Sequence, residues 1–316
     1  MSPAEQDWQP AASHDALRLR ARILGRIRAF FAARDVLEVE TPVLSQAANA
    51  DPAIASLAVQ GMGWLHTSPE FPMKRLLAAG SGAIYQIARV FRGGEQGRYH
   101  NPEFTLLEWY RPGFDHHALM DEVAGLVAEL IPASPANPPR IPYRDAFLDF
   151  AGFDPFQASL GQLRRVAGDI VGEVVGLGED RDAWLDLLFS TVVQPRLPAV
   201  CFVVDFPATQ AALARLSARD PRVAERFELF IGGVELANGY HELSDAVEQA
   251  RRMELEHRRR QTSGLPLNPI DVRLLAALRS GLPDCAGVAL GLDRLIMLAG
   301  EYTHIDQVLA FPWSRA

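Results

Sequence analysis

The sequence predicts an α+β fold in which helices flank an antiparallel β-sheet. Strand-like segments follow one another across short loops: residues 83–91 and 104–110 flank a loop rich in glycine and charge, and residues 226–231 and 233–239 meet at a pair of glycines. Neighbouring strands joined by hairpins pair antiparallel. Strands and helices do not alternate in the rhythm of a parallel sheet, so a βαβ fold is not expected.

Helices are predicted where apolar residues recur every three or four positions. In residues 15–34, Leu17, Leu24, Ile27 and Phe31 follow this spacing. The other expected elements are helices at residues 115–130, 160–196, 209–216 and 245–260, the last capped by Asp245, strands at residues 37–41 and 200–204, and a Pro-rich connector at residues 134–140.

Composition and charge indicate a soluble globular protein. The chain has 316 residues, 22% charged residues and a net charge of -8. An acidic surface does not favour broad contact with a phosphate backbone, which depends on clustered Lys and Arg, so tRNA is not an expected partner. Residues 1–10 lack the pattern of a signal peptide, and no apolar stretch reaches the ~20 residues of a membrane span. We expect a cytoplasmic protein in which Cys201 and Cys285 are buried thiols.

The segment FRGGEQGRYHNPEFTLLEWY, residues 91–110, concentrates charged and polar side chains in a strand–loop–strand. Alternate residues of a strand point to one face, so Glu108 and Tyr110 can line one pocket. The planar guanidinium of Arg92, at the end of the first strand, suits a phosphate. The alternative interpretation is a charged, exposed hairpin.

The segment FELFIGGVELANGYHEL, residues 227–243, places Glu228, Glu235 and Glu242 at seven-residue intervals, with Asn238 between the last two. Carboxylates on neighbouring strands form an oxygen site for Mg²⁺, and they can also hold an ammonium group. The alternative is a set of surface acids at strand edges, which is less favoured because acids on apolar strands are costly unless paired.

The segment GVALGLDR, residues 287–294, leads into an apolar helix. Gly287 and Gly291 allow close backbone approach to a ligand, and Arg294 at the helix start can meet a nucleotide. The spacing differs from the GxGxxG fingerprint of dinucleotide-binding folds. Such a turn alone does not define a function.

Together these segments resemble the signature motifs of class II aminoacyl-tRNA synthetases. Residues 18–42, a long helix followed by a strand and a proline, resemble motif 1, residues 91–104 resemble motif 2, and residues 287–294 resemble motif 3. Within this class, RYHNPEFTLLEWY, FELFIGG, ELANGYHEL and GLDR are most similar to lysyl-tRNA synthetases. The resemblance implies the class II catalytic core, an antiparallel β-sheet flanked by helices.

Other features favour a free-standing branch of this family. A lysyl-tRNA synthetase places an anticodon-binding domain before motif 1, and here motif 1 starts near residue 15. The sequence resembles the elongation factor P (R)-β-lysine ligases, which share TSPEF, found at residues 67–71, and ELANG(F/Y)HEL. Ala289 stands where lysyl-tRNA synthetases have glycine, and a methyl group there favours one isomer by only ~1–3 kcal/mol.

The resemblance also implies a role for each site residue. Arg92 would hold the α-phosphate and the substrate carboxylate, Phe104 would stack on adenine, and Arg294 would contact the other adenine face or the γ-phosphate. Further ATP contacts would come from Gly94, Glu95, His100, Asn101, Glu235, Leu236 and Gly291, the Mg²⁺ ligands would be Glu228 and Glu235, and the amino acid would lie among Ser68, Pro69, Glu70, Glu108, Tyr110, Asn238, Glu242 and Ala289. Motif 2 normally has glutamate at position 94, so here Glu95 or the loop backbone would take over its adenine contact.

The implied activity is the ATP- and Mg²⁺-dependent activation of (R)-β-lysine or lysine as an adenylate, followed by transfer to a lysine ε-amine of elongation factor P. The expected organisation is a tail at residues 1–14 and a catalytic domain at residues 15–316, forming a homodimer through residues 15–45. The alternatives are a truncated lysyl-tRNA synthetase that charges tRNA and a non-catalytic paralogue that senses an amino acid. Degraded paralogues usually lose the motif arginines or metal acids, which are all present here.

Overall fold

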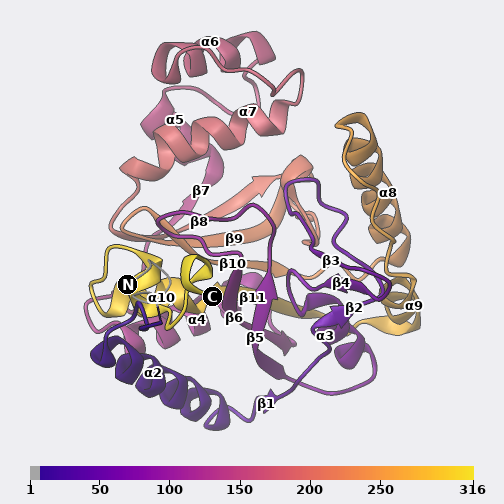
Figure 1. Ribbon diagram of the computed structural model, residues 1–316. Helices are drawn as coiled ribbons and strands as arrows, with labels where there is room; N and C mark the ends of the chain where they lie inside the picture. Colours follow the sequence, from indigo (N-terminus) through magenta and orange to yellow (C-terminus); the bar gives the residue numbers. More distant parts are fainter. Residues whose placement is uncertain (1–7) are drawn as a thin grey trace.

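An eight-stranded sheet forms the centre of the computed structural model, which describes residues 8–316 (Figure 1). The strand order is β1-β5-β6-β11-β10-β9-β8-β7; every pair from β5 to β8 is antiparallel, whereas β1 and β7 pair parallel at the two edges. The predicted α+β fold is confirmed. The strands are β1 (Leu37–Glu38), β5 (Ile84–Phe91), β6 (Glu103–Pro112), β7 (Arg140–Pro142), β8 (Val200–Pro207), β9 (Val223–Ile231), β10 (Val234–His241) and β11 (Cys285–Gly291).

A second, three-stranded sheet and a set of helices surround the large sheet. The second sheet has the order β2-β4-β3, with β2 (Leu44–Ser45), β3 (Ala58–Val59) and β4 (Gly63–Leu65). The α-helices are α2 (His14–Ala32), α3 (Glu70–Ala78), α4 (His116–Leu130), α5 (Tyr143–Ala151), α6 (Leu160–Val171), α7 (Arg181–Leu188), α8 (Ala246–Thr262), α9 (Val272–Gly281) and α10 (Leu292–Ala299). The short turns are the π-helical η1 (Phe189–Val193) and the 3₁₀ turns η2 (Gln194–Arg196), η3 (Ala208–Gln210), η4 (Ile305–Val308) and η5 (Trp313–Arg315). Among residues 8–316, none of the helices has the length and apolar character needed to cross a membrane.

One face of the large sheet is covered by α2, α4 and α10. Leu107 and Trp109, alternate residues of β6, pack there with Val288 of β11. Phe31 of α2 stacks on Tyr85 of β5, with ring centroids 4.3 Å apart. Burial of each large apolar side chain contributes about 1.5–3 kcal/mol to the stability of the folded state. This face therefore forms the hydrophobic core. The alternate residues of the same strands are left for the opposite face.

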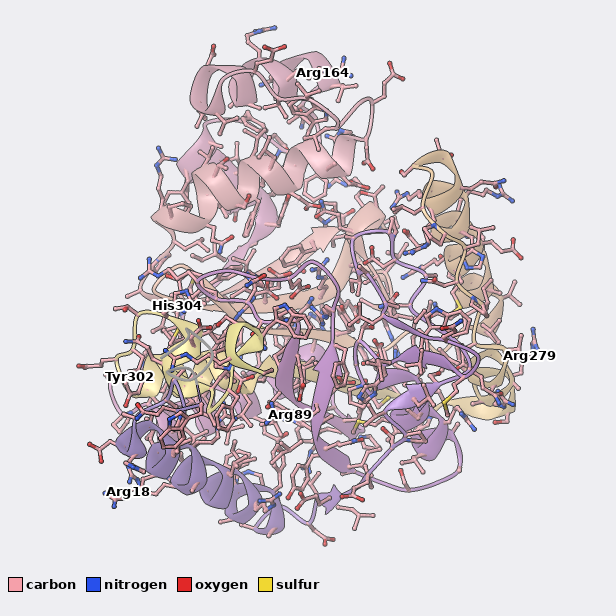
Figure 2. All side chains as sticks on the ribbon, in the orientation of Figure 1. Arg18, Arg89, Arg164, Arg279, Tyr302 and His304 are labelled. Atoms are coloured by element: carbon pink, nitrogen blue, oxygen red, sulfur yellow. The ribbon has the colours of Figure 1, made fainter. Side chains whose placement is uncertain are left out.

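Residues 143–196 form a helical segment at one end of the sheet, drawn at the top of Figure 1. The predicted continuous helix at 160–196 is wrong. Helix α6 ends at Val171, because the next residue, Gly172, has a φ of 79°, which favours glycine, and α7 starts only after Asp180. Asp180 caps α7 by accepting from backbone N–H groups. Figure 2 shows this segment from the same side, with Arg164 of α6 labelled.

Two shorter predictions also differ from the structure. The helix expected at residues 209–216 is an irregular edge segment, in which Ala212 has a φ of 47° and the N–H of Arg215 donates to the carbonyl of His241 at 2.9 Å. The strand expected at residues 37–41 is reduced to β1, because the chain leaves β5 soon after its short parallel pairing. Helices α3, α5 and α9 were not predicted.

Several local predictions are confirmed. Asp245 caps α8 by accepting from the N–H groups of Val247 at 2.8 Å and Glu248 at 3.1 Å. Cys201 and Cys285 are buried and free.

The predicted tail at residues 1–14 is described only in part, since residues 1–7 lie outside the described residues. The N–H groups of Ala11 and Ala12 donate to the carbonyls of Ala310 and Leu309, at 2.8 and 3.2 Å. The described part of the tail is therefore fastened to the C-terminal segment.

Candidate active site

Polar side chains form a row on the sheet face opposite α4. In the strand register Gln86 lies beside Glu108, Glu108 beside Ala289, Ala289 beside Asn238, and Asn238 beside Glu228. Directly opposed residues of paired strands project to the same face. The register therefore brings residues from the three sequence motifs to one surface across β5, β6, β11, β10 and β9.

A second row on this face contains Tyr110, Gly287, Tyr240 and Arg226. A Cβ built on Gly287 would lie 2.3 Å from the Tyr110 ring and 2.5 Å from a carboxylate oxygen of Glu242. Only glycine fits at this position. Bare backbone of β11 therefore forms the floor between Tyr110 and Glu242.

A β-bulge aims Glu235 at the same face. Glu235 and Asn238 are three residues apart, so a regular strand would place them on opposite faces. The register shifts between Glu235 and Ala237, with Leu236 as the extra residue. Leu236, predicted to contact ATP, is 2% exposed and packs in the core beneath α4. Its side chain is therefore turned away from the polar face.

Buried hydrogen bonds fasten the segment Ser68–Glu70 to β6. The Ser68 hydroxyl donates to Glu108 Oε2 at 2.7 Å, and the Tyr110 hydroxyl donates to Glu108 Oε1 at 2.6 Å. The Ser68 hydroxyl also accepts from the backbone N–H of Glu70 at 3.0 Å. Pro69 occupies the N-cap position of α3, so this helix begins at the edge of the pocket.

Lys74 of α3, which the sequence analysis did not select, lies among the pocket acids. Its Nζ is 2.7 Å from Glu70 Oε1 and 2.6 Å from Glu242 Oε2, and its side chain is 1% exposed. Burial lowers the pKa of Lys74, but the carboxylates of Glu242 and Glu70 more than offset this effect, and the pKa is raised overall. Lys74 is therefore a resident ammonium group.

The acids outnumber this one cation. Burial raises the pKa of Glu108, and the nearby Glu70 carboxylate raises it further. Burial also raises the pKa of Glu242, although Lys74 opposes the shift. Both carboxyl groups are desolvated without enough positive charge nearby. The pocket thus suits a ligand that brings ammonium groups.

Arg294 connects the start of α10 to the loop between β5 and β6. Its Nη1 donates to the carbonyl of Glu235 at 2.7 Å, its Nε donates to the carbonyl of Tyr99 at 3.2 Å, and its Nη2 lies 2.8 Å from His100 Nε2. Burial lowers the pKa of His100, and the Arg294 guanidinium lowers it further. A neutral imidazole can accept a hydrogen bond from Arg294. The motif 2 and motif 3 segments therefore meet here.

Arg92 lies at the end of β5, beside Phe104. Its guanidinium carbon is 5.1 Å from the centroid of the Phe104 ring, and its Nη1 is 3.7 Å from Glu95 Oε1. Gly94 has a φ of 76°, a conformation that glycine adopts without strain. The turn at Gly94 brings Glu95 back toward Arg92, although glutamate is displaced by one position from the usual motif.

Glu228 and Glu235 are neighbouring carboxylates that could hold a divalent cation. Burial raises the pKa of Glu228, and the Glu235 carboxylate contributes in the same direction, while Arg226 opposes it. Arg226 pairs with Glu228 Oε1 and donates through Nε to Asn238 Oδ1 at 3.3 Å. Two neighbouring carboxylates fit an ion such as Mg²⁺, which takes oxygen ligands, and the other oxygen of Glu228 has no partner among the described hydrogen bonds.

Asn101 and Gly291, both predicted to contact the nucleotide, make contacts within the protein. The Asn101 amide donates to the carbonyl of Glu103 at 2.6 Å and accepts from the N–H of Trp313 at 2.9 Å, so it fastens the loop to the C-terminal segment. Gly291 is the N-cap residue of α10, and a Cβ there would meet the Arg294 side chain at 3.6 Å. The predicted contacts of Asn101 and Gly291 with ATP stay predictions.

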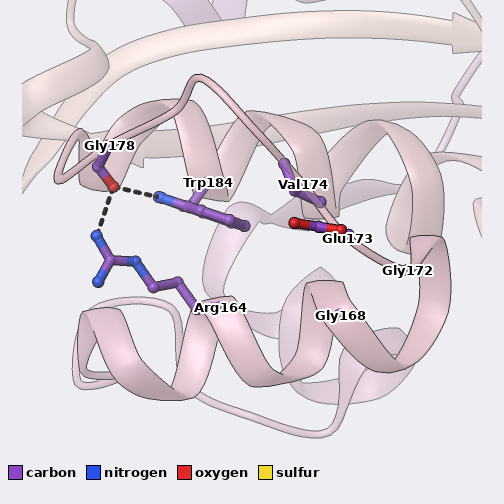
Figure 3. Close-up of a pocket in the computed structure, with 7 residues that line it drawn as sticks. All are labelled: Arg164, Gly168, Gly172, Glu173, Val174, Gly178 and Trp184. Atoms are coloured by element: carbon purple, nitrogen blue, oxygen red, sulfur yellow. Dashed lines mark hydrogen bonds between the residues drawn. The ribbon is translucent and has the colours of Figure 1, made fainter.

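A cavity of about 330 Å³ opens beside the pocket acids. Ser68 and Glu70 line one side of it, and Arg75 and Arg273 contribute to its wall. A different hollow, of about 420 Å³, lies within the helical segment (Figure 3). Trp184 lines that hollow, and none of the predicted site residues does.

The sequence analysis missed Lys74, Gln86, Arg226 and Tyr240. Arg226 and Tyr240 lie two residues before Glu228 and Glu242, so strand alternation was an available signal for both. Lys74 follows Glu70 by four residues, which is helical spacing, but α3 itself was not predicted. Gln86, which accepts from the Thr41 hydroxyl at 2.9 Å, is recognised only from its cross-strand neighbour.

Comparison with known proteins identifies the class. Residues 6–315 match the family described as tRNA synthetases class II (D, K and N). The chain belongs to this family, and its fold is the class II synthetase catalytic domain.

Three similar proteins share a single name. The chain is 50% identical over 322 residues to the elongation factor P–(R)-β-lysine ligase of Vibrio cholerae. The alignment covers 98% of this chain and 99% of the relative. The proteins of that name from Proteus mirabilis and Yersinia enterocolitica are 50% and 49% identical over 322 and 323 residues, with 98% of each chain covered.

Glutamine at position 108 should stabilise the ligand-free protein in mild alkali. A carboxyl group whose pKa is raised on folding opposes folding above the ordinary glutamate pKa, and this penalty fades as pH falls and the group is protonated. We expect Glu108→Gln to raise the free energy of unfolding by about 1–3 kcal/mol near pH 8 and by much less near pH 5.

Urea denaturation at the two pH values measures this difference. Glu103→Gln, at an exposed position of the same strand, serves as the matched control and should change neither value. Equal destabilisation by Glu108→Gln at both pH values would contradict an excess of negative charge in the pocket.

Proposed function

We propose that this chain is an ATP-dependent ligase that activates (R)-β-lysine, or lysine, as its acyl-adenylate and transfers the aminoacyl group to a lysine ε-amine of elongation factor P. The observation that supports the proposal is the buried cluster of Glu70, Glu108 and Glu242, on the sheet face whose polar row also includes Asn238 and Glu228. Family membership and relatives named for this activity support it.

Charge complementarity selects the amino acid. Three carboxylates face one resident ammonium, that of Lys74, which leaves a deficit that two further ammonium groups can fill. Lysine and β-lysine each carry two. A neutral amino acid would leave buried carboxylates unpaired, which is strongly unfavourable in a desolvated pocket. Specificity for an amino acid with two ammonium groups therefore follows from the excess of carboxylates in the pocket.

The reaction requires alignment and charge neutralisation more than a nucleophile from the protein. The amino-acid carboxylate attacks the α-phosphorus of ATP, pyrophosphate leaves, and the acceptor amine then attacks the adenylate carbonyl, losing a proton and releasing AMP. Arg92 would hold the α-phosphate and the substrate carboxylate, Phe104 would stack on adenine, and Arg294 would contact the other adenine face or the γ-phosphate. Mg²⁺ held by Glu228 and Glu235 would supply further positive charge at the phosphates.

Ala289 bears on the choice of isomer. It stands between Glu108 and Asn238 in the polar row, where its methyl group projects into the amino-acid site. A methyl group there can reject one isomer while accepting another whose amine is shifted along the chain. The discrimination is modest, ~1–3 kcal/mol.

The alternatives are a lysyl-tRNA synthetase activity and a non-catalytic sensor. The net charge of -8 disfavours extended contact with tRNA. A sensor has no need for paired phosphate-binding arginines beside a carboxylate pair, and Arg92, Arg294, Glu228 and Glu235 are all retained. We place the activity in the cytoplasm and in one catalytic domain, residues 15–316, behind a tail at residues 1–14.

The acceptor decides among these activities. The enzyme is incubated with ATP, Mg²⁺ and labelled (R)-β-lysine or lysine, and elongation factor P and tRNA are then offered in separate reactions. We expect label on elongation factor P, more from (R)-β-lysine than from lysine, and none on tRNA. Charging of tRNA alone would establish the synthetase activity, and the absence of pyrophosphate exchange with any amino acid would establish a sensor.

Arg92→Ala should abolish activation while the protein remains folded. Loss of a charged donor aimed at the reacting phosphate is expected to lower ATP–pyrophosphate exchange by at least about 10²–10³-fold. Arg89→Ala, which removes an exposed arginine of the same strand, should leave exchange unchanged. Near-normal exchange by a folded Arg92→Ala variant would remove Arg92 from the mechanism.

We also propose a homodimer through residues 15–45. This region includes α2 and the adjoining edge strand, where Leu37 and Val43 expose 58% and 40% of their surface. Apolar side chains of this kind beside the sheet edge favour burial against a second copy. Light scattering at micromolar concentration should give twice the chain mass of 34.8 kDa; a monomer would contradict the interface.

A further inference from the structure

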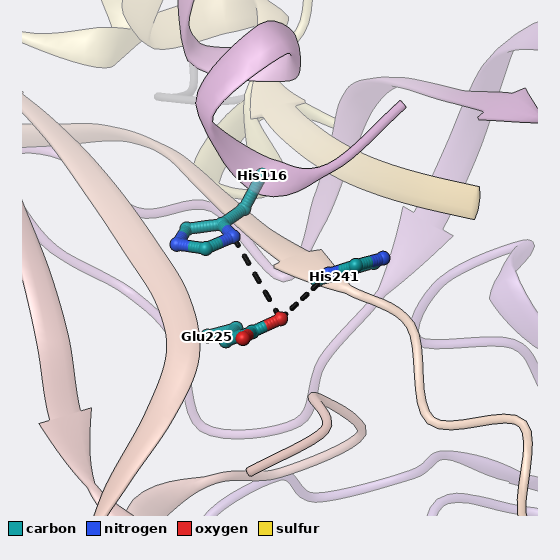
Figure 4. A group of neighbouring side chains, drawn as sticks. All are labelled: His116, Glu225 and His241. Atoms are coloured by element: carbon teal, nitrogen blue, oxygen red, sulfur yellow. Dashed lines mark hydrogen bonds and ion pairs between the residues drawn. The ribbon is translucent and has the colours of Figure 1, made fainter. Parts of the chain in front are cut away.

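A second polar cluster lies on the opposite face of the sheet from the candidate active site. His116 comes from the first residue of α4, Glu225 from β9 and His241 from the end of β10 (Figure 4). Glu225 and His241 alternate with the active-site residues of their strands, so they project toward α4. The cluster therefore has no part in the chemistry proposed above.

The three side chains converge on a small volume. One ligand atom of each lies within 4.8 Å of the other two. Glu225 Oε2 is 2.6 Å from His241 Nδ1 and 3.9 Å from His116 Nδ1. In a tetrahedral zinc site with bonds of about 2 Å, ligand atoms are about 3.3 Å apart. This separation lies between the two observed distances to Glu225, so both come within range of it when the Glu225 carboxylate and the rings shift slightly.

His116 lacks the hydrogen bond that a buried imidazole requires. The residue is 6% exposed, and its Nδ1 has no hydrogen-bond partner among residues 8–316, although it points toward Glu225 (Figure 4). A buried nitrogen without a partner carries a desolvation cost of about 1–3 kcal/mol.

His241 has the outer-shell partner that metal-bound histidines usually have. Its Nε2 lies 3.1 Å from Asp284 Oδ1, on the far side of the ring from Glu225. A carboxylate at this nitrogen fixes the ring and leaves Nδ1 as the coordinating atom. Glu225 and Asp284 expose 19% and 65% of their side chains, so an ion can enter from solvent.

We propose that His116, Glu225 and His241 form a structural site for a divalent transition metal, with zinc as the ion that best suits two imidazoles and one carboxylate. Borderline-soft nitrogen ligands select such ions over Mg²⁺, and water would complete a tetrahedron. The ion would join the start of α4 to β9 and β10. It would provide the missing partner of His116 and stabilise the folded chain.

Zinc titration of the full-length, untagged protein tests the site. The protein is first stripped with a chelator, and excess Mg²⁺ is present to occupy carboxylate-only sites. We expect one high-affinity zinc per chain, visible absorption bands when Co²⁺ replaces zinc, and a higher melting temperature with zinc. His116→Gln should weaken zinc binding at least about tenfold and abolish the thermal shift.

Matched variants separate the site from other histidines. His304→Gln, at an exposed position, should bind zinc as the unchanged protein does. Asp284→Asn changes the outer partner of His241 and also weakens the ion pair of Asp284 with Arg215. It should weaken zinc binding about 10–100-fold, and it tests the site if His116→Gln does not fold. The proposal is overturned if the unchanged protein takes up no zinc at micromolar concentration, or if zinc affinity is the same in the folded His116 and Asp284 variants.

Discussion

The buried contact of Lys74 with Glu70 and Glu242 is the interaction on which the candidate active site depends. It links α3 to the end of β10, and these elements form two walls of the pocket. Removing one partner of such a buried pair costs about 3–5 kcal/mol, because the other charge is left uncompensated. The same ammonium also sets the charge of the pocket, since it leaves the acids in excess by an amount that a dicationic ligand can balance.

Strand alternation divides the sheet into two independent surfaces. Asn238 and Tyr240 of β10 lie on the polar face, as does Glu242, which follows this strand, whereas Ala237 and His241 face α4. The bulge at Leu236 is what adds Glu235 to the polar face despite its odd spacing from Asn238. A single irregularity therefore brings the candidate metal acid and the amino-acid contacts together without disturbing the apolar core behind them.

Much of the fold and the site could be predicted from local sequence patterns. The hairpins around residues 92–102 and at Gly232 follow from strand-forming runs that flank glycine-rich turns, and the Asp245 cap follows from its spacing to Glu248. Lys74 could not be assigned, because a lysine on an unpredicted amphipathic helix is ordinarily a solvent-facing residue. The break in residues 160–196 depends on the left-handed conformation of glycines, which apolar periodicity does not reveal. The cluster of His116, Glu225 and His241 joins residues more than a hundred positions apart, so it depends on tertiary structure alone.

The way the large sheet ends limits how another protein can reach the polar face. Its outermost strands are only two and three residues long, and β7 closes with Pro142, which has no N–H to offer. Further along β5, the N–H of Phe91 already donates to the carbonyl of His66, at 3.0 Å. Edge strands this short offer another chain few free backbone groups with which to pair as an added strand. Addition of a strand from another protein at these edges is therefore disfavoured, and the polar face is approached from above the sheet.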